Sequence, residues 1–167
     1  YFESYKSAII QIGAEEKEDT PYDANGISVK FSALHPRYEM VQYDIVMSVM
    51  VPRVIELAKL AKEKGLGFTI DAEEADRLDI SLDIFEILAR SSELQDWDGL
   101  GIVVQAYQKR APYVLDWLAT LGRELGRKFM VRLVKGAYWD SEIKHAQEQG
   151  LDGYPVYTRK AATDISY

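Results

Sequence analysis

The amino-acid sequence predicts an α/β fold, namely a parallel (β/α)8 barrel of the TIM type with only about the first four βα units present. Two patterns indicate this fold. The first is a weak internal repeat of four short β-rich runs, each with large apolar residues at its second and fourth positions and a polar residue at its fifth. These runs are residues 26–30, 67–71, 101–105 and 128–132. The second pattern is the helical segment between successive runs, because strands that alternate with helices indicate right-handed βαβ units and a parallel sheet.

Apolar residues recur at helical spacing in the segments between these runs. The apolar stripes cover residues 43–61, 78–88 and 114–125, and Pro112 fits the first turn of the third helix, where its missing N–H is harmless. Residues 157–167 begin a further helix. A complete barrel takes about 250 residues, so this chain holds about half of one. A doubly wound open sheet is the alternative, but no glycine-rich turn follows the first strand, which disfavours it.

The start of the chain differs from the rest. Residues 1–12 carry apolar side chains at helical spacing, which predicts an opening helix that ends at Gly13. Residues 14–25 are mostly polar and contain a proline, which is typical of a linker. We therefore divide the chain into residues 1–25, an N-terminal helix and linker, and residues 26–167, the first half of the barrel.

Composition excludes several classes of protein. The net charge is −7 and the pI is near 4.9, whereas a nucleic-acid-binding segment would need a clustered basic face. The chain has no cysteine, which excludes disulfides and thiolate sites, and its two histidines lie far apart, so we expect no metal site. No apolar run approaches the roughly 20 residues that span a bilayer, and the start of the chain does not resemble a signal peptide. We expect a cytoplasmic protein.

A polar residue ends each of the four strand runs. These residues are Lys30, Asp71, Gln105 and Arg132. In a (β/α)8 barrel the carboxyl ends of the strands carry the chemistry, so we expect the four side chains to gather there. Because Lys30 and Asp71 end neighbouring strands, their charged groups are placed to form an ion pair.

The densest cluster of candidate ligand-binding residues begins at Arg132. A guanidinium, the amine of Lys135 and the small residues at 136–137 fit close approach by a flat, anionic ligand. Tyr138 and Trp139 would supply walls for an aromatic ring system.

Four other polar residues have structural interpretations. Glu73, Glu74 and Asp76 follow the second strand, and we expect them to stabilise the positive end of the next helix. His35 lies in the loop after the first strand, where a structural role is favoured over a catalytic one because nothing nearby orients it as a base.

The sequence around these residues resembles the proline utilization A family of bifunctional flavoenzymes. The similarity follows the family's order over nearly all of residues 26–167, and its strongest blocks are residues 27–38, 70–78, 104–110, 132–140 and 153–160. The family's proline dehydrogenase domain is a (β/α)8 barrel that holds FAD non-covalently. It oxidises L-proline to 1-pyrroline-5-carboxylate by hydride transfer to the flavin, the first step of proline catabolism.

The resemblance implies a role for each candidate residue. Lys30 should bind the carboxylate of the substrate, and Gln105 and Arg132 should hydrogen-bond the flavin ring. Asp71 and Tyr138 should shape and close the substrate pocket, so that Asp71, Tyr138 and Arg132 form the catalytic set. The remaining residues should line the flavin and its ribityl-phosphate chain; they are Val134, Lys135, Gly136, Ala137 and Trp139.

The resemblance also implies partners outside this chain. These are a quinone-type electron acceptor at a membrane surface, with peripheral membrane association, and an aldehyde dehydrogenase domain in the same parent protein. The sequence is also compatible with an oligomer. The family's pair of carboxylate-binding arginines belongs to the second half of the barrel, so we expect the 167 residues alone to be inactive.

Two other functions remain open on the residues alone. The first is a lysine-dependent aldolase or lyase on the same barrel, with Lys30 or Lys135 as the Schiff-base amine. The second is a non-catalytic half-barrel that serves as a structural or binding module in a larger assembly.

Overall fold

The computed structural model describes residues 1–15 and 18–167. Its centre is a sheet of four parallel strands in the order β1-β2-β3-β4. The strands are β1 (Gly26–Val29), β2 (Gly67–Ile70), β3 (Leu100–Gln105) and β4 (Met130–Val134). The order is sequential and lacks the reversal of a doubly wound sheet. The predicted α/β fold with a parallel sheet is therefore confirmed.

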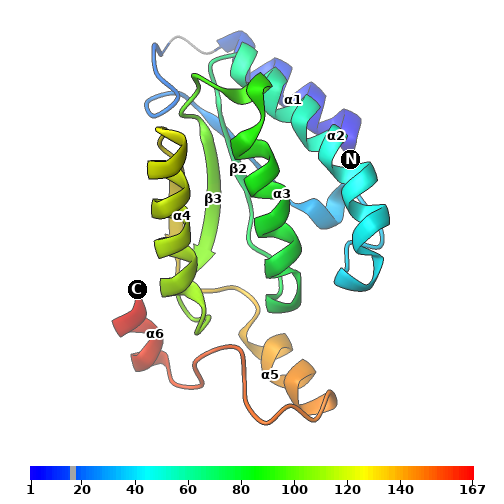
Figure 1. The fold of residues 1–167 in the computed structure, drawn as a ribbon, viewed down its shortest axis with the longest axis vertical. Helices are drawn as coiled ribbons and strands as arrows, with labels where there is room; N and C mark the ends of the chain where they lie inside the picture. Colours follow the sequence, from blue (N-terminus) through cyan, green and yellow to red (C-terminus); the bar gives the residue numbers. More distant parts are fainter. Residues whose placement is uncertain (16–17) are drawn as a thin grey trace.

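Three helices connect the strands and lie together on one face of the sheet (Figure 1). They are α2 (Tyr43–Glu63), α3 (Leu78–Arg90) and α4 (Ala111–Leu125), and all three agree with the predicted apolar stripes. Pro112 lies in the first turn of α4, as predicted. The short 3-10 helices are η1 (Phe31–Ala33), η2 (Met40–Gln42), η3 (Ala75–Arg77) and η4 (Ser92–Leu94).

Two further helices lie beyond the carboxyl ends of the strands, at the end toward which the arrow of β3 points in Figure 1. They are α5 (Trp139–Glu148) and α6 (Lys160–Ser166), and α6 is the helix expected within the last residues. In the described part of the chain, none of the helices has the length and hydropathy needed to cross a bilayer.

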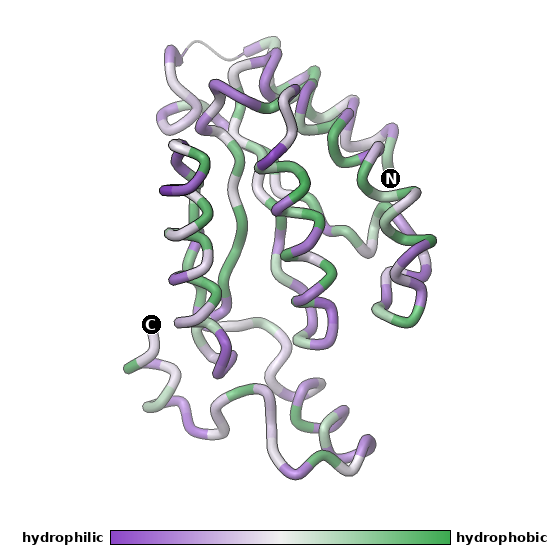
Figure 2. The backbone as a smooth tube through the Cα atoms, viewed as in Figure 1, coloured by the Kyte–Doolittle hydropathy of each residue, from purple (hydrophilic) through white to green (hydrophobic). Residues whose placement is uncertain are grey.

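The core lies between the sheet and the helices. The apolar residues at the second and fourth positions of the repeats point toward this side, where Val29, Phe68 and Ile70 are completely buried. Figure 2 shows hydrophobic residues along the strands and an alternation of hydrophobic and hydrophilic residues along the helices. Each fully buried side chain of this size contributes about 1.5–3 kcal/mol to folding. The amphipathic pattern of each helix therefore fixes which face meets the sheet.

Helix α1 (Phe2–Glu15) packs against α2 and differs from the prediction at its end. Gly13 was expected to end the helix, but the helix continues through it to Glu15. A Cβ atom at Gly13 would lie only 2.6 Å from the Cβ of Lys64, so the glycine allows close contact between the helix and the end of α2. Packing has overridden the usual role of glycine as a helix stop. Residues 16 and 17 of the predicted linker lie outside the described residues.

The hydrogen-bond register corrects the alignment of the repeats. Ser28 pairs with Thr69, Thr69 with Gly101, and Gly101 with Met130, so these residues form one row across the inner face. Gly101, and not Val103 as the repeat implied, occupies this row on β3. The reason is that a gapless sequence alignment carries no information about the stagger between strands.

The same register changes one of the predicted strand ends, that of Arg132. Val103 pairs with Arg132, and Gln105 pairs with Val134 at the end of both strands. Arg132 therefore lies inside β4, two residues before its end. Gln105 does end its strand, but it stands one inward-facing row beyond Arg132. Lys30 and Asp71 directly follow the ends of β1 and β2, as predicted.

The sheet curves toward its inner face, the face opposite α2, α3 and α4. The Arg132 guanidinium on β4 lies 3.5 Å from the hydroxyl of Ser28 on β1. In a flat sheet, β1 and β4 would be about 14 Å apart, because neighbouring strands are about 4.8 Å apart and three spacings separate them. Side chains leave a sheet roughly perpendicular to it, so an arginine reaches across three strands only where the sheet is strongly curved.

The free edges of β1 and β4 lead to our first prediction. Residues 1–167 expressed alone should self-associate, because within the described residues both outer edges lack a partner strand and such edges template association. Val131 on β4 is 41% exposed. Replacing it with lysine should shift most of the material toward monomer, as measured by size-exclusion chromatography with light scattering.

The matched control for this experiment is Val41→Lys, because Val41 is 83% exposed but lies in η2, away from the sheet. The control should leave the assembly unchanged. A monomeric parent fragment, or an equal effect of the two substitutions, would contradict the prediction.

Candidate functional site

A concavity of about 300 Å³ opens on the inner face at the carboxyl ends of the strands. Residues from all four strands or from the turns that follow them line it. They are Lys30, Asp71, Ala72, Val103, Gln105, Arg132, Val134, Lys135, Gly136, Ala137 and Tyr138. The structure thus brings together the polar residues predicted at the strand ends and most of the cluster that follows β4.

The charged residues pair differently from the prediction. Asp71 forms an ion pair with Arg132, and the expected ion pair between Lys30 and Asp71 is absent from the described residues. The Lys30 ammonium instead lies against the phenol of Tyr138, which is the largest influence raising the pKa of the lysine, ahead of Asp71 and Glu73. The curvature of the sheet explains the exchange, because it brings Arg132 over the strand that carries Asp71.

The side chain of Gln105 joins two loops of the site. It is 3% exposed. Its Nε2 donates to the carbonyl of Glu73 at 2.9 Å, and its Oε1 accepts from the N–H of Ala137 at 3.0 Å. Both amide atoms therefore have a backbone partner, and each keeps one further hydrogen-bonding position. Gln105 holds the turn after β4 against the loop after β2.

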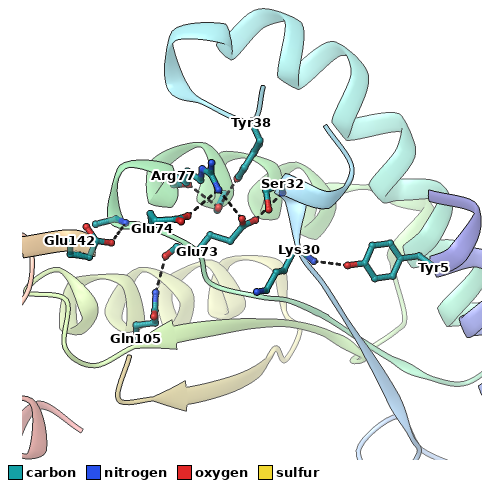
Figure 3. Close-up of polar contacts among 11 residues, drawn as sticks. Tyr5, Lys30, Ser32, Tyr38, Glu73, Glu74, Arg77, Gln105 and Glu142 are labelled. Atoms are coloured by element: carbon teal, nitrogen blue, oxygen red, sulfur yellow. Dashed lines mark hydrogen bonds and ion pairs between the residues drawn. The ribbon is translucent and has the colours of Figure 1, made fainter. Parts of the chain in front are cut away.

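Glu73 has a different role from the predicted one. Its carboxylate is buried and accepts hydrogen bonds from the N–H of Ser32 at 2.9 Å and from Arg77 at 3.0 Å (Figure 3). Glu73 thus connects the loop after β1 with the loop after β2. The prediction that Glu73 stabilises the end of the next helix is wrong. Glu74 also accepts from Arg77, at 3.0 Å. The sequence pattern missed this because the partner Ser32 lies 41 residues away in sequence.

The turn after β4 rests on the ring of Tyr107. Gly136 has φ of 142°, a conformation that other residues rarely adopt. A Cβ atom at Gly136 would lie 2.4 Å from Cγ of Tyr107, so the glycine sits directly on the aromatic ring. The Tyr107 hydroxyl accepts a hydrogen bond from the N–H of Tyr138 at 3.2 Å. The predicted close approach at residue 136 is thus made to the protein itself.

Part of the predicted cofactor-binding cluster also faces a second concavity, of about 420 Å³. It shares Lys135 and Gly136 with the first concavity, and Trp139 also lines it. Lys135 and Lys160 both pair with the carboxylate of Asp164, each at 2.6 Å. Two cations therefore share one anion at this end of the site.

Glu142 of α5 is a buried carboxylate that the sequence did not reveal. It is 4% exposed, and its Oε1 accepts the N–H of Ala75 at 2.6 Å. Burial raises the pKa of Glu142, and the carboxylates of Asp76 and Glu74 raise it further. The Ala75 N–H and His145 act in the opposite direction. Glu142 thus anchors α5 to the start of η3, close to the loop that carries Asp71.

Tyr107, Glu73 and Glu142 are therefore the functional candidates that sequence reasoning missed. Tyr107 lies in residues 104–110, which had been singled out only as part of a resemblance. In residues 104–110 polar and aromatic residues interrupt an apolar pattern, which could have marked Tyr107 as a candidate. Nothing in that pattern identifies the residues that Tyr107 contacts.

Comparison with known proteins assigns the chain to a family. A family model described as proline dehydrogenase matches residues 1–167. The chain belongs to the proline dehydrogenase family. Its curated relatives include the bifunctional protein PutA of Klebsiella aerogenes, 56% identical over 167 residues, and that of Rhizobium meliloti, 54% identical. The chain spans only 13% of the length of each of these relatives.

Solved structures agree with this assignment to the proline dehydrogenase family. A crystal structure of proline utilization A from Bradyrhizobium japonicum has a TM-score of 0.98 at 55% identity, and the match covers 100% of this chain and 17% of that one. Proline utilization A from Bdellovibrio bacteriovorus, solved after inactivation by N-propargylglycine, has a TM-score of 0.90 at 29% identity. That match covers 100% of this chain and 18% of the other. The predicted resemblance to proline utilization A is thus confirmed.

The anchor formed by Glu142 gives our second prediction. Because its folded-state pKa lies above the unfolded value, the folded state binds the proton more readily, and stability falls as pH rises through the folded-state pKa. Glu142→Gln keeps an acceptor for Ala75 and removes the charge. The variant should therefore gain stability over the parent protein at pH 8, and this difference should shrink as pH falls toward 5.

The quantity to measure is the temperature at which the domain containing this chain unfolds in the full-length protein. Intrinsic fluorescence monitors the unfolding at a series of pH values. Glu148→Gln serves as the control, because Glu148 lies on the same helix and is exposed. A difference between Glu142→Gln and the parent protein that grows as pH falls would contradict the assignment.

Proposed function

We propose that the protein containing this chain oxidises L-proline to 1-pyrroline-5-carboxylate with FAD as the electron acceptor. The observation that carries the proposal is the placement of Lys30, Asp71, Arg132 and Tyr138 around one concavity, in a member of the proline dehydrogenase family. An amino acid substrate needs a cation for its carboxylate, and these four residues offer two cations against one carboxylate.

The proposal includes closure of the sheet into a (β/α)8 barrel in the parent protein. The sequential strand order, the helices on a single face and the strong curvature all support such closure. The strands that complete the barrel would add the other half of the site. On this view residues 26–167 form the first half of the barrel, and the 167 residues alone should lack proline dehydrogenase activity.

The charge and the exposed aromatic surface of the residues present support FAD as the ligand. The Arg132 side chain is 53% exposed toward the inner concavity, although it lies on a central part of its strand. Lys135 and Lys160 share one carboxylate, which leaves positive charge for the phosphates of a dinucleotide. Val134, Gly136, Ala137 and Trp139 would line the same ligand, with an exposed indole and exposed backbone at 136–137.

The chain's own residues would orient the substrate and stabilise charge. FAD, when bound, supplies the acceptor for the hydride that leaves the substrate. Lys30 would hold the substrate carboxylate, because its raised pKa keeps it protonated at neutral pH. The Tyr138 phenol beside it and Asp71 would limit the size of the pocket. These contacts fix the ring geometry before reaction, which is where much of the rate enhancement arises.

Arg132 and Gln105 would serve the flavin ring. A fixed cation near the ring stabilises negative charge that arrives with the hydride. The Asp71 carboxylate holds the Arg132 guanidinium in place and partly offsets its charge. Gln105 keeps one N–H and one lone pair after its two backbone contacts, so it retains the capacity to bond a ligand.

The alternative of a Schiff-base lysine is disfavoured by the same contacts. A nucleophilic lysine needs a lowered pKa, so that its amine is free of the proton. The pKa of Lys30 is raised, chiefly by Tyr138, and that of Lys135 is raised, chiefly by its hydrogen bond to Asp164. Both lysines act as cations in this arrangement.

Partners beyond this chain follow from the relatives. Because the curated relatives are bifunctional proteins of which this chain spans 13%, we infer a second catalytic domain, an aldehyde dehydrogenase, in the parent protein. We also infer transfer of electrons to a quinone-type acceptor during peripheral contact with a membrane surface.

Our third prediction tests the reaction itself. Full-length parent protein should be purified with bound FAD, and anaerobic addition of L-proline should bleach the flavin absorbance. D-proline serves as the matched control, because it carries the same charged groups with the opposite configuration at Cα. Bound through those groups, it would place its reacting carbon wrongly relative to the flavin. Flavin that remains oxidised in the presence of L-proline would overturn the proposal.

The fourth prediction separates the roles of the two cations. Arg132→Met should slow flavin reduction by about 10²- to 10³-fold and weaken flavin binding, because one preorganised charge contact is lost. Lys30→Met should act mainly by raising the concentration of proline needed for half-maximal reduction. Stopped-flow reduction across a proline titration measures both quantities.

Arg123→Met is the matched control, because Arg123 is exposed on α4 and contacts Thr120 on the opposite side of the sheet from the site. It should behave like the parent protein. Interchanged effects of the Arg132 and Lys30 variants would show that the roles are wrongly assigned, even if the reaction is correct.

A further inference from the structure

Tyr107 connects three segments of the site through its backbone and side chain. It follows β3 and is 3% exposed. Its N–H donates to the carbonyl of Lys135 at 2.8 Å, at the end of β4. Its carbonyl accepts from the N–H of Tyr157 at 2.8 Å, on the segment that leads to α6. These backbone contacts require no particular side chain at residue 107.

The side chain of Tyr107 makes two separable contacts. Its ring supports Gly136, as the 2.4 Å distance to a Cβ atom built there demonstrates. Its hydroxyl accepts the N–H of Tyr138 at 3.2 Å. A phenylalanine would supply the first contact without the second. Burial of a hydroxyl is unfavourable unless it is hydrogen-bonded, so the contact with the N–H of Tyr138 offsets the cost of burying this hydroxyl.

The hydroxyl contact acts on the residue beside Lys30. Tyr138 begins α5 as its N-terminal cap residue, and its phenol lies against the Lys30 ammonium. Fixing the backbone N–H of Tyr138 fixes the position from which that side chain reaches Lys30. The Tyr107 hydroxyl stays protonated, because burial raises its pKa, with Glu142 adding to the effect.

We propose that Tyr107 is a positioning residue for the substrate, whose hydroxyl holds Tyr138 against Lys30 while its ring supports the turn at Gly136. The inference rests on the proposed function, because it assigns the Lys30–Tyr138 pair to L-proline. The two contacts serve different ligands. The ring acts on the turn that lines the cofactor, and the hydroxyl acts on the residues that hold the substrate.

The experiment uses the full-length, flavin-loaded parent protein and the variant Tyr107→Phe. We expect the KM for L-proline to rise about 3- to 10-fold, the consequence of losing one hydrogen bond. Flavin content and kcat should stay close to those of the parent protein, because the ring remains. Tyr113→Phe is the matched control, since Tyr113 is 75% exposed on α4, and its KM should not change.

A second variant keeps the test decisive. Tyr107→Leu removes the ring as well as the hydroxyl, and we expect it to lose flavin as well as proline affinity. If Tyr107→Phe loses flavin like Tyr107→Leu, or if its KM is unchanged, the separate roles of ring and hydroxyl are refuted.

A double-mutant cycle with Tyr138→Phe tests whether the hydroxyl acts through Tyr138. In the Tyr138→Phe background, Tyr107→Phe should change the KM less than about twofold, because the side chain that it positions no longer carries its hydroxyl. Fully additive effects would overturn the inference. Failure of this inference is distinguishable from failure of the proposed function. If L-proline does not bleach the flavin of the parent protein, it is the proposed function that fails.

One readout does not depend on turnover. Amide hydrogen exchange in the peptide that contains Tyr138 should be faster in Tyr107→Phe than in the parent protein, because the N–H has lost its acceptor. Unchanged exchange there would contradict the role of the hydroxyl, whatever the kinetics.

Discussion

The site depends first on the two hydrogen bonds of the Gln105 amide. They join the carbonyl of Glu73 to the N–H of Ala137, and so they connect the loop after β2 with the turn after β4 across the end of β3. The amide is nearly inaccessible to water, so the loss of either bond would leave a buried polar atom of Gln105 without that partner. The loops that carry Asp71 and Tyr138 thus owe their mutual placement to a residue on the strand between them.

Two cations lie beside one carboxylate at two places around the site. On the inner face Arg132 pairs with Asp71 and Lys30 lines the same concavity, while Lys135 and Lys160 share Asp164 beside the second concavity. Each group has one more cation than anion, within a chain whose net charge is −7. Local positive charge on an acidic protein concentrates anions at the places where it collects. A substrate carboxylate and a cofactor phosphate are the two anions that the proposed reaction brings.

The sequence was informative where structure depends on local periodicity. The apolar stripes located α2, α3 and α4, and the alternation of strands and helices gave the parallel sheet. The site residues at the ends of β1 and β2 were found for the same reason. The errors arose where a contact joins distant residues.

Three residues illustrate this limit. The row of Arg132 depends on stagger between strands, which no single strand encodes. The pairing of Asp71 with Arg132 in place of Lys30 depends on curvature of the whole sheet. The importance of Tyr107 appears only through Gly136 and Tyr138, about thirty positions later in the chain. Each of these is a property of the assembled sheet and its loops.

The unequal strand ends give the inner face the form of a step. On β3 and β4 the strand continues through the row of Gln105 and Val134, whereas β1 and β2 end before the row of Lys30 and Asp71. In the proposed reaction, a broad ligand that rests against β3 and β4 would leave room beside it over the ends of β1 and β2, next to Lys30. The unequal strand ends would therefore separate two ligands by size without a moving segment. A large planar molecule would bind against β3 and β4, and a small one would bind beside it at the ends of β1 and β2.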